Sequence, residues 1–267
     1  MPNKNILVSA VTLIVAANIA TGQTPQKGSV ESSSANVSQE IVVSASRDYR
    51  AVYQIPANVT VLTGDDLNAP DVVTIVDALA NLDGVYFRST SANAMQQEIS
   101  MRGFGENSFG RVLVLLDGVR LNRPDGAGIN WAQIPLNTVD RIEVLRGGQS
   151  ALYGDNAVGG VVNIVTKKGS GKPQVSASIV GGSYGLNVER AGVSGATGSV
   201  SYAASLERTQ EQGYRDRSAY LTWGGNANLG YDFCERGSLT LGLAYDAMNS
   251  QSPGGLTKAQ MDENPRQ

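Results

Sequence analysis

The chain has 267 residues, and its 21 basic and 24 acidic side chains give a formal net charge of −3. This near balance leaves no electrostatic footprint for nucleic acid. Histidine is absent, which excludes histidine-based triads, histidine-ligated zinc and histidine acid–base catalysis. The 31 glycines favour short strands and turns, and the single Cys234 excludes an intrachain disulfide framework.

The N-terminus has the pattern of an export signal. Lys4 precedes the apolar run Ile6–Ala20, which is shorter than the roughly 20 residues of a transmembrane helix. Small residues favour cleavage after Gly22, so residues 1–22 are interpreted as a signal peptide. A buried core helix or a membrane anchor is the alternative.

Residues 23–49 are a leader in which one segment stands out. Up to residue 39 the leader is rich in Ser, Gln and Asn without an apolar period, so we expect disorder. Glu40–Arg47 is a β-prone segment after this leader. It could pair with the sheet edge of a partner or inside its own domain.

The pattern from 50 to 168 predicts a small α+β domain with its own core. Arg111–Asp117 is nearly all apolar, as in a strand buried on both faces, and Asp117-Gly118 favours a hairpin turn. The strands that we expect are Val59–Leu62, Val85–Phe87, Glu98–Arg102, Arg111–Asp117, Val119–Leu121, Arg141–Leu145 and Gly160–Thr166.

Two helices are expected in this domain. Thr63–Leu67 offers a helix start, where Asp65 and Asp66 are better explained by the helix dipole than as a metal pair. Asp71 is the expected N-cap of a helix over Val72–Leu82, because apolar residues recur there at helical spacing. Gly84 suits the left-handed position after that helix.

Signals for catalysis are weak. Gly103 and Gly105 lack the third glycine of a dinucleotide-binding loop. Arg102, Glu143 and Arg146 are charges among apolar strand residues, which favours an internal ion-pair network or a solvated edge over a catalytic site. An enzyme is therefore the least favoured class.

Plain alternation of apolar and polar residues begins after Lys172. Five or six such strands lie between 172 and 247, with Tyr and Trp near segment ends, which favours a membrane β-barrel over a soluble antiparallel sandwich. A membrane barrel needs at least about eight strands, and an open edge in lipid is costly. We therefore expect residues 248–267 to be a truncated polar tail and the chain to be the N-terminal part of a longer protein.

Several sequence segments resemble the plug domain of TonB-dependent outer-membrane receptors. These are Met101–Phe104, Val114–Val119 and Pro135–Lys168, and with the alternating strands the resemblance covers about residues 40–250. Glu40–Arg47 is similar to the family's TonB box. Gly213–Asp216, in a connection between two strands, is similar to a segment of the family's branch that takes cobalamin and siderophores.

The resemblance implies a fold class: an α+β plug domain followed by antiparallel transmembrane β-barrel strands, an incomplete part of a barrel of about 22 strands. It implies a non-enzymatic receptor in the cell outer membrane that takes up a metal chelate, such as an iron siderophore or cobalamin, without a cofactor of its own. Its partners would be TonB, the chelate and outer-membrane lipid, with no nucleic acid. Because the family's chains are several hundred residues longer, a gene fragment is expected.

The resemblance also implies roles for individual residues. Charges that hold the plug against the barrel wall would be Arg102, Glu143 and Arg146. TonB would pair with Ile41, Val42, Val43, Ser44 and Ala45. Ligand contacts from the apical plug loops would come from Ser91, Asn93, Asn122, Arg123, Asp125 and Asn130. The alternative is a free-standing periplasmic binding or interaction module, in which the plug folds alone and the strands form a soluble half-sandwich.

Overall fold

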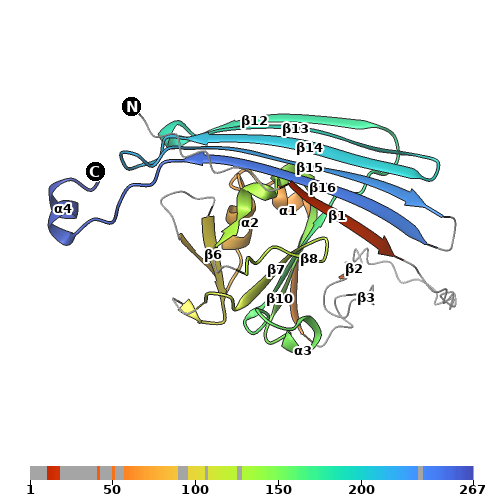
Figure 1. The fold of residues 1–267 in the computed structure, drawn as a ribbon, viewed down its shortest axis with the longest axis horizontal. Helices are drawn as coiled ribbons and strands as arrows, with labels where there is room; N and C mark the ends of the chain where they lie inside the picture. The colour runs from red at the N-terminus through yellow and green to blue at the C-terminus, as the bar shows by residue number, and fades with distance from the viewer. Residues whose placement is uncertain are drawn as a thin grey trace, which may run out of the picture.

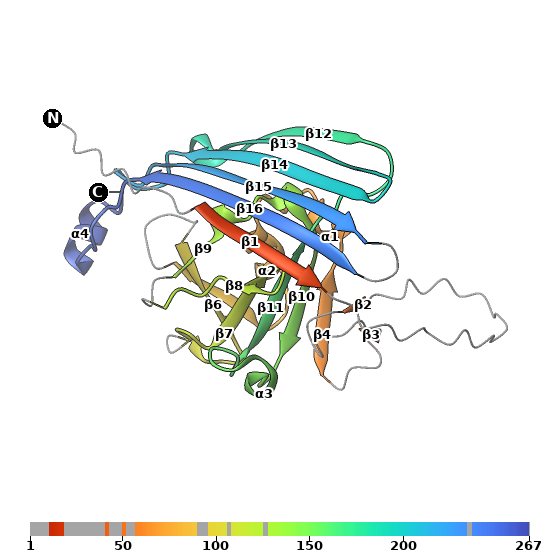
Figure 2. The same cartoon turned by 45° about the vertical axis from the view of Figure 1, so that its right-hand side comes forward.

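The structure is a computed structural model that describes residues 11–18, 41–42, 50–51, 57–89, 96–105, 108–124, 128–233 and 237–266. A mixed α/β domain lies against one face of a long, curved antiparallel sheet (Figures 1 and 2). The two expected regions are therefore both present, and they are in contact.

The α/β domain is built on a mixed five-stranded sheet. Its strands, in spatial order, are β4 (Asn58–Leu62), β10 (Val139–Arg146), β11 (Gly160–Thr166), β7 (Val112–Leu116) and β8 (Val119–Arg120). β11 runs parallel to β7 and antiparallel to β10. Every residue of β7 is buried, which confirms the prediction of a strand covered on both faces.

One face of this sheet carries the larger core. It is covered by two helices and a second sheet, namely α1 (Gly64–Leu67), α2 (Ile75–Ala80), β5 (Val85–Ser89), β6 (Gln96–Met101) and β9 (Ile129–Asn130). A smaller core, around Leu113, Leu145 and Val161, lies on the opposite face near α3 (Ser150–Tyr153). Two short 3₁₀ helices, η3 (Trp131–Gln133) and η4 (Leu136–Thr138), precede β10.

The helix starts are explained by local capping. At α1, the Asp66 carboxylate accepts hydrogen bonds from the backbone N–H and the hydroxyl of Thr63, both at 2.8 Å, which confirms the helix-start interpretation of this acid. The prediction for α2 is wrong at its start. The N-cap is Thr74, which forms a capping box with Asp77, whereas the Asp71 carboxylate accepts from the side-chain amide of Asn81.

The predicted turns are confirmed. Gly84 follows α2 with a φ of 74°. Asp117 and Gly118 both have positive φ, 49° and 82°, as a two-residue hairpin turn requires, and β8 pairs antiparallel with β7.

The large sheet contains five consecutive antiparallel strands, within the expected range. They are β12 (Gln174–Gly181), β13 (Asn187–Thr197), β14 (Val200–Glu211), β15 (Tyr220–Asp232) and β16 (Ser238–Ser250). A short 3₁₀ turn, η5 (Ser183–Gly185), joins β12 to β13, and the helix α4 (Lys258–Glu263) lies in the polar tail.

The N-terminal segments add two further pairings. β1 (Val11–Asn18), inside the expected signal peptide, pairs antiparallel with β16. The signal peptide over residues 1–22 stays a prediction. β2 (Ile41–Val42) pairs with β3 (Arg50–Ala51), and the rest of the leader lies outside the described residues.

Candidate functional site: the interface between the plug-like domain and the sheet

The two faces of the large sheet differ in polarity. Polar side chains are buried on the face toward the α/β domain, namely Ser205, Thr209, Thr222 and Asp246. Large apolar side chains are exposed on the other face, including Val175 (83% exposed), Ile179 (78%) and Leu206 (60%). A soluble sandwich buries its apolar face, so this arrangement is the reverse of the sandwich alternative and is the pattern of a membrane-type wall.

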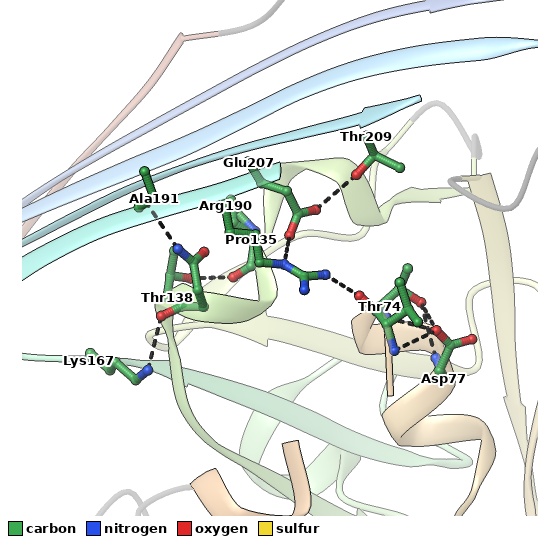
Figure 3. Close-up of polar contacts among 11 residues, drawn as sticks. Thr74, Asp77, Pro135, Thr138, Lys167, Arg190, Ala191, Glu207 and Thr209 are labelled. Atoms are coloured by element: carbon green, nitrogen blue, oxygen red, sulfur yellow. Dashed lines mark hydrogen bonds and ion pairs between the residues drawn. The ribbon is translucent and has the colours of Figure 1, made fainter. Parts of the chain in front are cut away.

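An ion pair on the inner face reaches the plug-like domain. Arg190 of β13 and Glu207 of β14 are cross-strand partners, with 2.6 Å between Nε and Oε2. The same guanidinium donates to the backbone carbonyl of Val73, directly before the N-cap Thr74 (Figure 3). Because both charged side chains are largely buried, at 8% and 14% exposure, the pair fixes the start of α2 to the sheet.

A second contact lies at the loop that leads into β10. The side-chain amide of Asn137 donates a hydrogen bond to the backbone carbonyl of Ala191, at 3.1 Å. The backbone carbonyl of Asn137 accepts a hydrogen bond from the ammonium of Lys167, also at 3.1 Å (Figure 3). Gly192 lies beside this contact, where an added Cβ would be 3.3 Å from the Asn137 amide nitrogen. The absence of a side chain at Gly192 lets the loop approach the strand.

A third contact joins η3 to β15 and β16. The side-chain amide of Asn130 donates to Asp246 at 2.8 Å, while the oxygen of the same amide accepts from the N–H of Ala132. Ala132 also packs with Tyr220 of β15 and Met248 of β16. At Gly224 an added Cβ would lie 2.3 Å from the Ala132 carbonyl oxygen, so the backbones meet closely here.

A fourth contact runs through the turn of the β7–β8 hairpin. The Asp117 carboxylate accepts from the backbone N–H and the hydroxyl of Thr166, at 2.9 and 2.6 Å. Asn228 of β15 donates to the same Thr166 hydroxyl oxygen at 2.7 Å. The interface is therefore a set of polar contacts spread over β13, β14, β15 and β16.

Of the three predicted plug charges, Arg146 and Glu143 have polar partners within the α/β domain. Arg146 donates to Thr60, to Asn58 and to the carbonyl of Asp83. Glu143 is fully buried and accepts hydrogen bonds from Arg141 and Asn163, so it lies in an internal ion pair, one of the two structural arrangements that the sequence left open. Arg102 is exposed at a φ of 61°, and its guanidinium lies beside Gly147. Their contact with a barrel wall stays a prediction.

The predicted ligand residues separate into three groups. Asn122 is engaged by the edge of β7, accepting from the N–H of Val114 and donating to the carbonyl of Val112. Asn130 belongs to the contact with Asp246, and Arg123 lies near enough to act on that carboxylate electrostatically. The others, Ser91, Asn93 and Asp125, lie outside the described residues.

The predicted TonB-binding segment is described in part. Ile41 and Val42 form β2, opposite Ala51 and Arg50 of β3. Val43, Ser44 and Ala45 lie outside the described residues. Pairing inside the chain was one of the two outcomes expected for this segment, and it does not test pairing with a partner.

Metal-type side-chain clusters and membrane-crossing helices are both absent from the described ranges. Within them, no three His, Cys, Asp or Glu side chains are grouped so that they could hold a metal ion. No helix in the same ranges combines the length and apolarity needed to cross a membrane.

The sequence reasoning missed Arg190 and Glu207, although a signal was present. Both are charged residues at the inward positions of alternating strands, and the glycine turn at Gly198 sets the register that makes them neighbours. Their contact with Val73 depends on how the two regions dock, which no local pattern encodes.

Comparisons with known proteins agree with this geometry. Residues 51–161 match the family model described as TonB-dependent Receptor Plug Domain. The chain is 36% identical over 129 residues to the vitamin B12 transporter BtuB of Vibrio cholerae, covering 48% of this chain and 21% of that one. It is 34% identical over 201 residues to the iron-regulated outer membrane virulence protein of Vibrio cholerae, covering 67% of this chain and 30% of that one.

Solved structures share the fold. The ferripyoverdine receptor of Pseudomonas aeruginosa aligns with a TM-score of 0.65 at 19% identity, over 78% of this chain and 27% of the receptor. The ferric yersiniabactin uptake receptor FyuA of Yersinia pestis aligns with a TM-score of 0.62 at 22% identity, over 73% of this chain and 32% of that one.

A mixed α/β domain fixed to the polar inner face of an antiparallel sheet with an apolar outer face defines part of a plugged membrane receptor. The chain spans 21% to 30% of the length of the curated relatives named above. Residues 51–161 are a TonB-dependent receptor plug domain. The chain is a homologue of TonB-dependent transporters, which are not enzymes.

Proposed function

We propose that this chain supplies the plug and the first wall strands of an outer-membrane receptor for active uptake of a metal chelate of the siderophore or cobalamin kind. One observation carries the proposal: the plug is held by buried polar contacts, above all Arg190 with Glu207 and the Val73 carbonyl, to a sheet whose opposite face is apolar. A removable plug inside a membrane wall needs both features. The polar contacts can be exchanged for water, and the apolar face favours lipid.

The chelate class rests on relatedness. The relatives named above include a vitamin B12 transporter and an iron-regulated outer membrane protein, and the structural neighbours include receptors for ferripyoverdine and ferric yersiniabactin. The ligand would meet the apical plug loops, with Arg123 as the cation that suits an anionic chelate. Ser91, Asn93, Asn122, Asp125 and Asn130 would supply further contacts.

TonB is the partner that would drive the plug. Its binding segment would be Ile41–Ala45, which would add a strand to the sheet of TonB. In this chain β2 is already paired with β3, so TonB would have to replace β3 as the partner of Ile41 and Val42. Export by residues 1–22 would deliver the chain to the periplasm and then to the outer membrane.

The location is tested in a Gram-negative host with a fusion in which this chain, with its own N-terminus, replaces the matching N-terminal part of a TonB-dependent transporter, because five strands alone leave an open edge in lipid. We expect the fusion in the outer-membrane fraction, shortened at its N-terminus, and resistant to extraction by salt and carbonate. Recovery as a soluble periplasmic protein would overturn the proposal in favour of the free-standing module.

The uptake role is tested by binding. Purified chain is titrated with cyanocobalamin and with a panel of ferric siderophores, and separately with the periplasmic domain of TonB. We expect TonB binding that is lost in Val42→Pro, and binding of at least one chelate. Failure to bind both TonB and every chelate would contradict the proposed role.

A further inference from the structure

The edge of the large sheet at β16 is occupied by a strand from the N-terminal part of the chain. β1 pairs antiparallel with residues 238–245 of β16 over its whole length. Figures 1 and 2 show β1 along this edge, on the side of β16 away from β15. The strand belongs to the apolar run over residues 6–20, in which the sequence predicts an export signal. One segment therefore combines a leader pattern with a strand position.

The register matches β1 to the outer row of β16. That row is apolar and exposed, and it consists of Leu239, Leu241, Leu243 and Tyr245. The register partners in β1 are all apolar as well, namely Ala17, Val15, Leu13 and Val11. Because strand residues alternate between two faces, a slip by one residue would bring Thr12 and Asn18 into this row. The pairing therefore has one preferred register.

The inner row of β16 matches β1 less well. This row faces the plug-like domain, and its residues are polar or small. Gly242 of the inner row lies between Asn228 of β15 and Ile14 of β1. A β-branched apolar residue thus stands where the neighbouring strand has an amide. The fit of β1 is sufficient to pair with the edge but poorer than the fit of β15.

β1 also covers only part of the edge. β15 pairs with β16 over residues 238–250, whereas the register of β1 stops at Tyr245. Residues 246–250 lie beyond that register, so another strand can begin to pair there. A strand edge presents a row of N–H and C=O groups that readily accepts a further strand.

We propose that β1 is a displaceable cover, which occupies the edge of β16 and keeps the sheet from accepting another amphipathic strand while residues 1–22 are attached. The strand that fits has apolar residues at every second position, opposite the outer row of β16. It starts at residues 246–250 and replaces β1, or it adds directly once the leader has been removed. This cover acts whether or not the chain takes up a ligand.

The covalent attachment of β1 to the sheet explains why a poorly matched strand can hold the edge. A strand in the same chain competes at an effective concentration of up to about millimolar, so a free strand at micromolar concentration does not displace it. Cutting the connection removes this advantage, and the poor match at Gly242 then favours exchange. Removal of the leader thus converts a covered edge into an acceptor edge.

The contact is tested by disulfide trapping in the full chain. Cys234 is the only cysteine, so Cys234→Ser gives a background without thiols. Val15→Cys with Leu241→Cys joins two register partners, and we expect a disulfide within one chain under mild oxidation. Val15→Cys with Tyr245→Cys is the control, because four residues along a strand span about 13 Å, beyond the reach of a disulfide. Equal disulfide yields in the two variants would overturn the pairing.

The covering role is tested with a protease site inserted after Gly22. The full chain is folded in detergent and then cut, and the released leader is removed by gel filtration. The probe is a fluorescent peptide of residues 11–18, whose binding is measured by fluorescence anisotropy. We expect the cut chain to bind it at least about tenfold more tightly than the uncut chain. A peptide with residues 12 and 13 exchanged has the same composition without the alternation, and it should bind more weakly.

A second variant opens the edge without cutting. Successive N–H groups of a strand point to opposite sides, so Ile14→Pro with Val15→Pro removes one donor that faces β16. The uncut chain with both substitutions should bind the peptide as the cut chain does. Circular dichroism verifies that the sheet is intact in each sample.

The outcomes are separate from those of the uptake role. Equal peptide binding by the cut and uncut chains would overturn the covering role of β1. If neither the cut chain nor the double proline variant binds the peptide, with the sheet intact, the edge does not accept this kind of strand and the proposal fails. Binding of TonB and of chelates is measured in other samples, so these results leave the proposed uptake untouched.

Discussion

Arg190 and Glu207 face each other across β13 and β14, and their ion pair points at the carbonyl of Val73 (Figure 3). One residue further along β14, on the opposite face, Arg208 pairs with Glu189. The same two strands thus carry two arginine–glutamate pairs, one buried against the plug and one exposed. This makes the second pair a matched control for the first.

The buried pair predicts a large effect of Arg190→Ala on plug docking. Removing one partner of a buried pair leaves the other charge without compensation, at a cost of about 3–5 kcal/mol, and here the contact to Val73 is lost as well. We expect faster amide hydrogen exchange in the first turn of α2, which follows Val73. Hydrogen exchange of the purified chain measures this directly.

The control for that prediction is Arg208→Ala. An exposed pair contributes about 0–1 kcal/mol, so α2 should exchange as in the unchanged chain. Replacing both buried partners, as Arg190→Met with Glu207→Leu, should recover part of the stability because no charge is then left unpaired. Unchanged exchange in α2 after Arg190→Ala would refute the role of this contact in docking.

Close backbone approach predicts a second effect, at Gly224. An added Cβ would lie 2.3 Å from the carbonyl oxygen of Ala132, so Gly224→Ala must push η3 away from β15. We expect destabilisation of about 1–3 kcal/mol, measured as a lower denaturation midpoint of the plug. Gly254→Ala, where nothing lies within 4 Å of the added Cβ, should have no comparable effect. Equal midpoints for the two variants would contradict the close approach.

Much of the fold was predictable because its signals are local. Alternation with period two identified the long strands, and the apolar run at Arg111–Asp117 identified a strand covered on both faces. The start of α2 could not be predicted in the same way, because Asp71 and Thr74 are both residue types that cap helices well. The reciprocal hydrogen bonds between Thr74 and Asp77 make Thr74 the N-cap. The interface between the plug-like domain and the large sheet is formed by residues that lie far apart in the sequence. Asn130 with Asp246 is one such contact, and no local pattern contains it.

The capping box at α1 predicts a pH dependence. The backbone N–H and then the hydroxyl of Thr63 lower the pKa of the Asp66 carboxyl, because both donate to its charged form. A folded-state pKa below the ordinary 3.8 means that the carboxylate stabilises the fold above that value. This contribution is lost as the pH falls through the lowered pKa.

We therefore expect Asp66→Asn to be less stable than the unchanged chain at neutral pH, by less than about 1 kcal/mol since the site is exposed. The difference should vanish in strong acid. Denaturant unfolding at both pH values measures it. Asp65→Asn lies in the same turn outside the capping box and serves as the control. A difference that persists unchanged in acid would contradict this role of the Asp66 charge.

The pairing of β2 with β3 predicts opposite effects of two proline substitutions on TonB binding. Val42→Pro removes a backbone donor from the segment that TonB would pair with, so binding should be lost. Arg50→Pro weakens β3, the strand that competes with TonB for Ile41 and Val42, so binding should become tighter. Titration of each variant with the periplasmic domain of TonB measures both.

The plug core should tolerate both changes, because β2 and β3 form a two-stranded sheet apart from the five-stranded one. Thermal unfolding of each variant verifies this. Normal TonB affinity in Val42→Pro would remove Ile41–Ala45 as the binding segment. Weaker affinity in Arg50→Pro would mean that β3 presents β2 to TonB instead of competing with it.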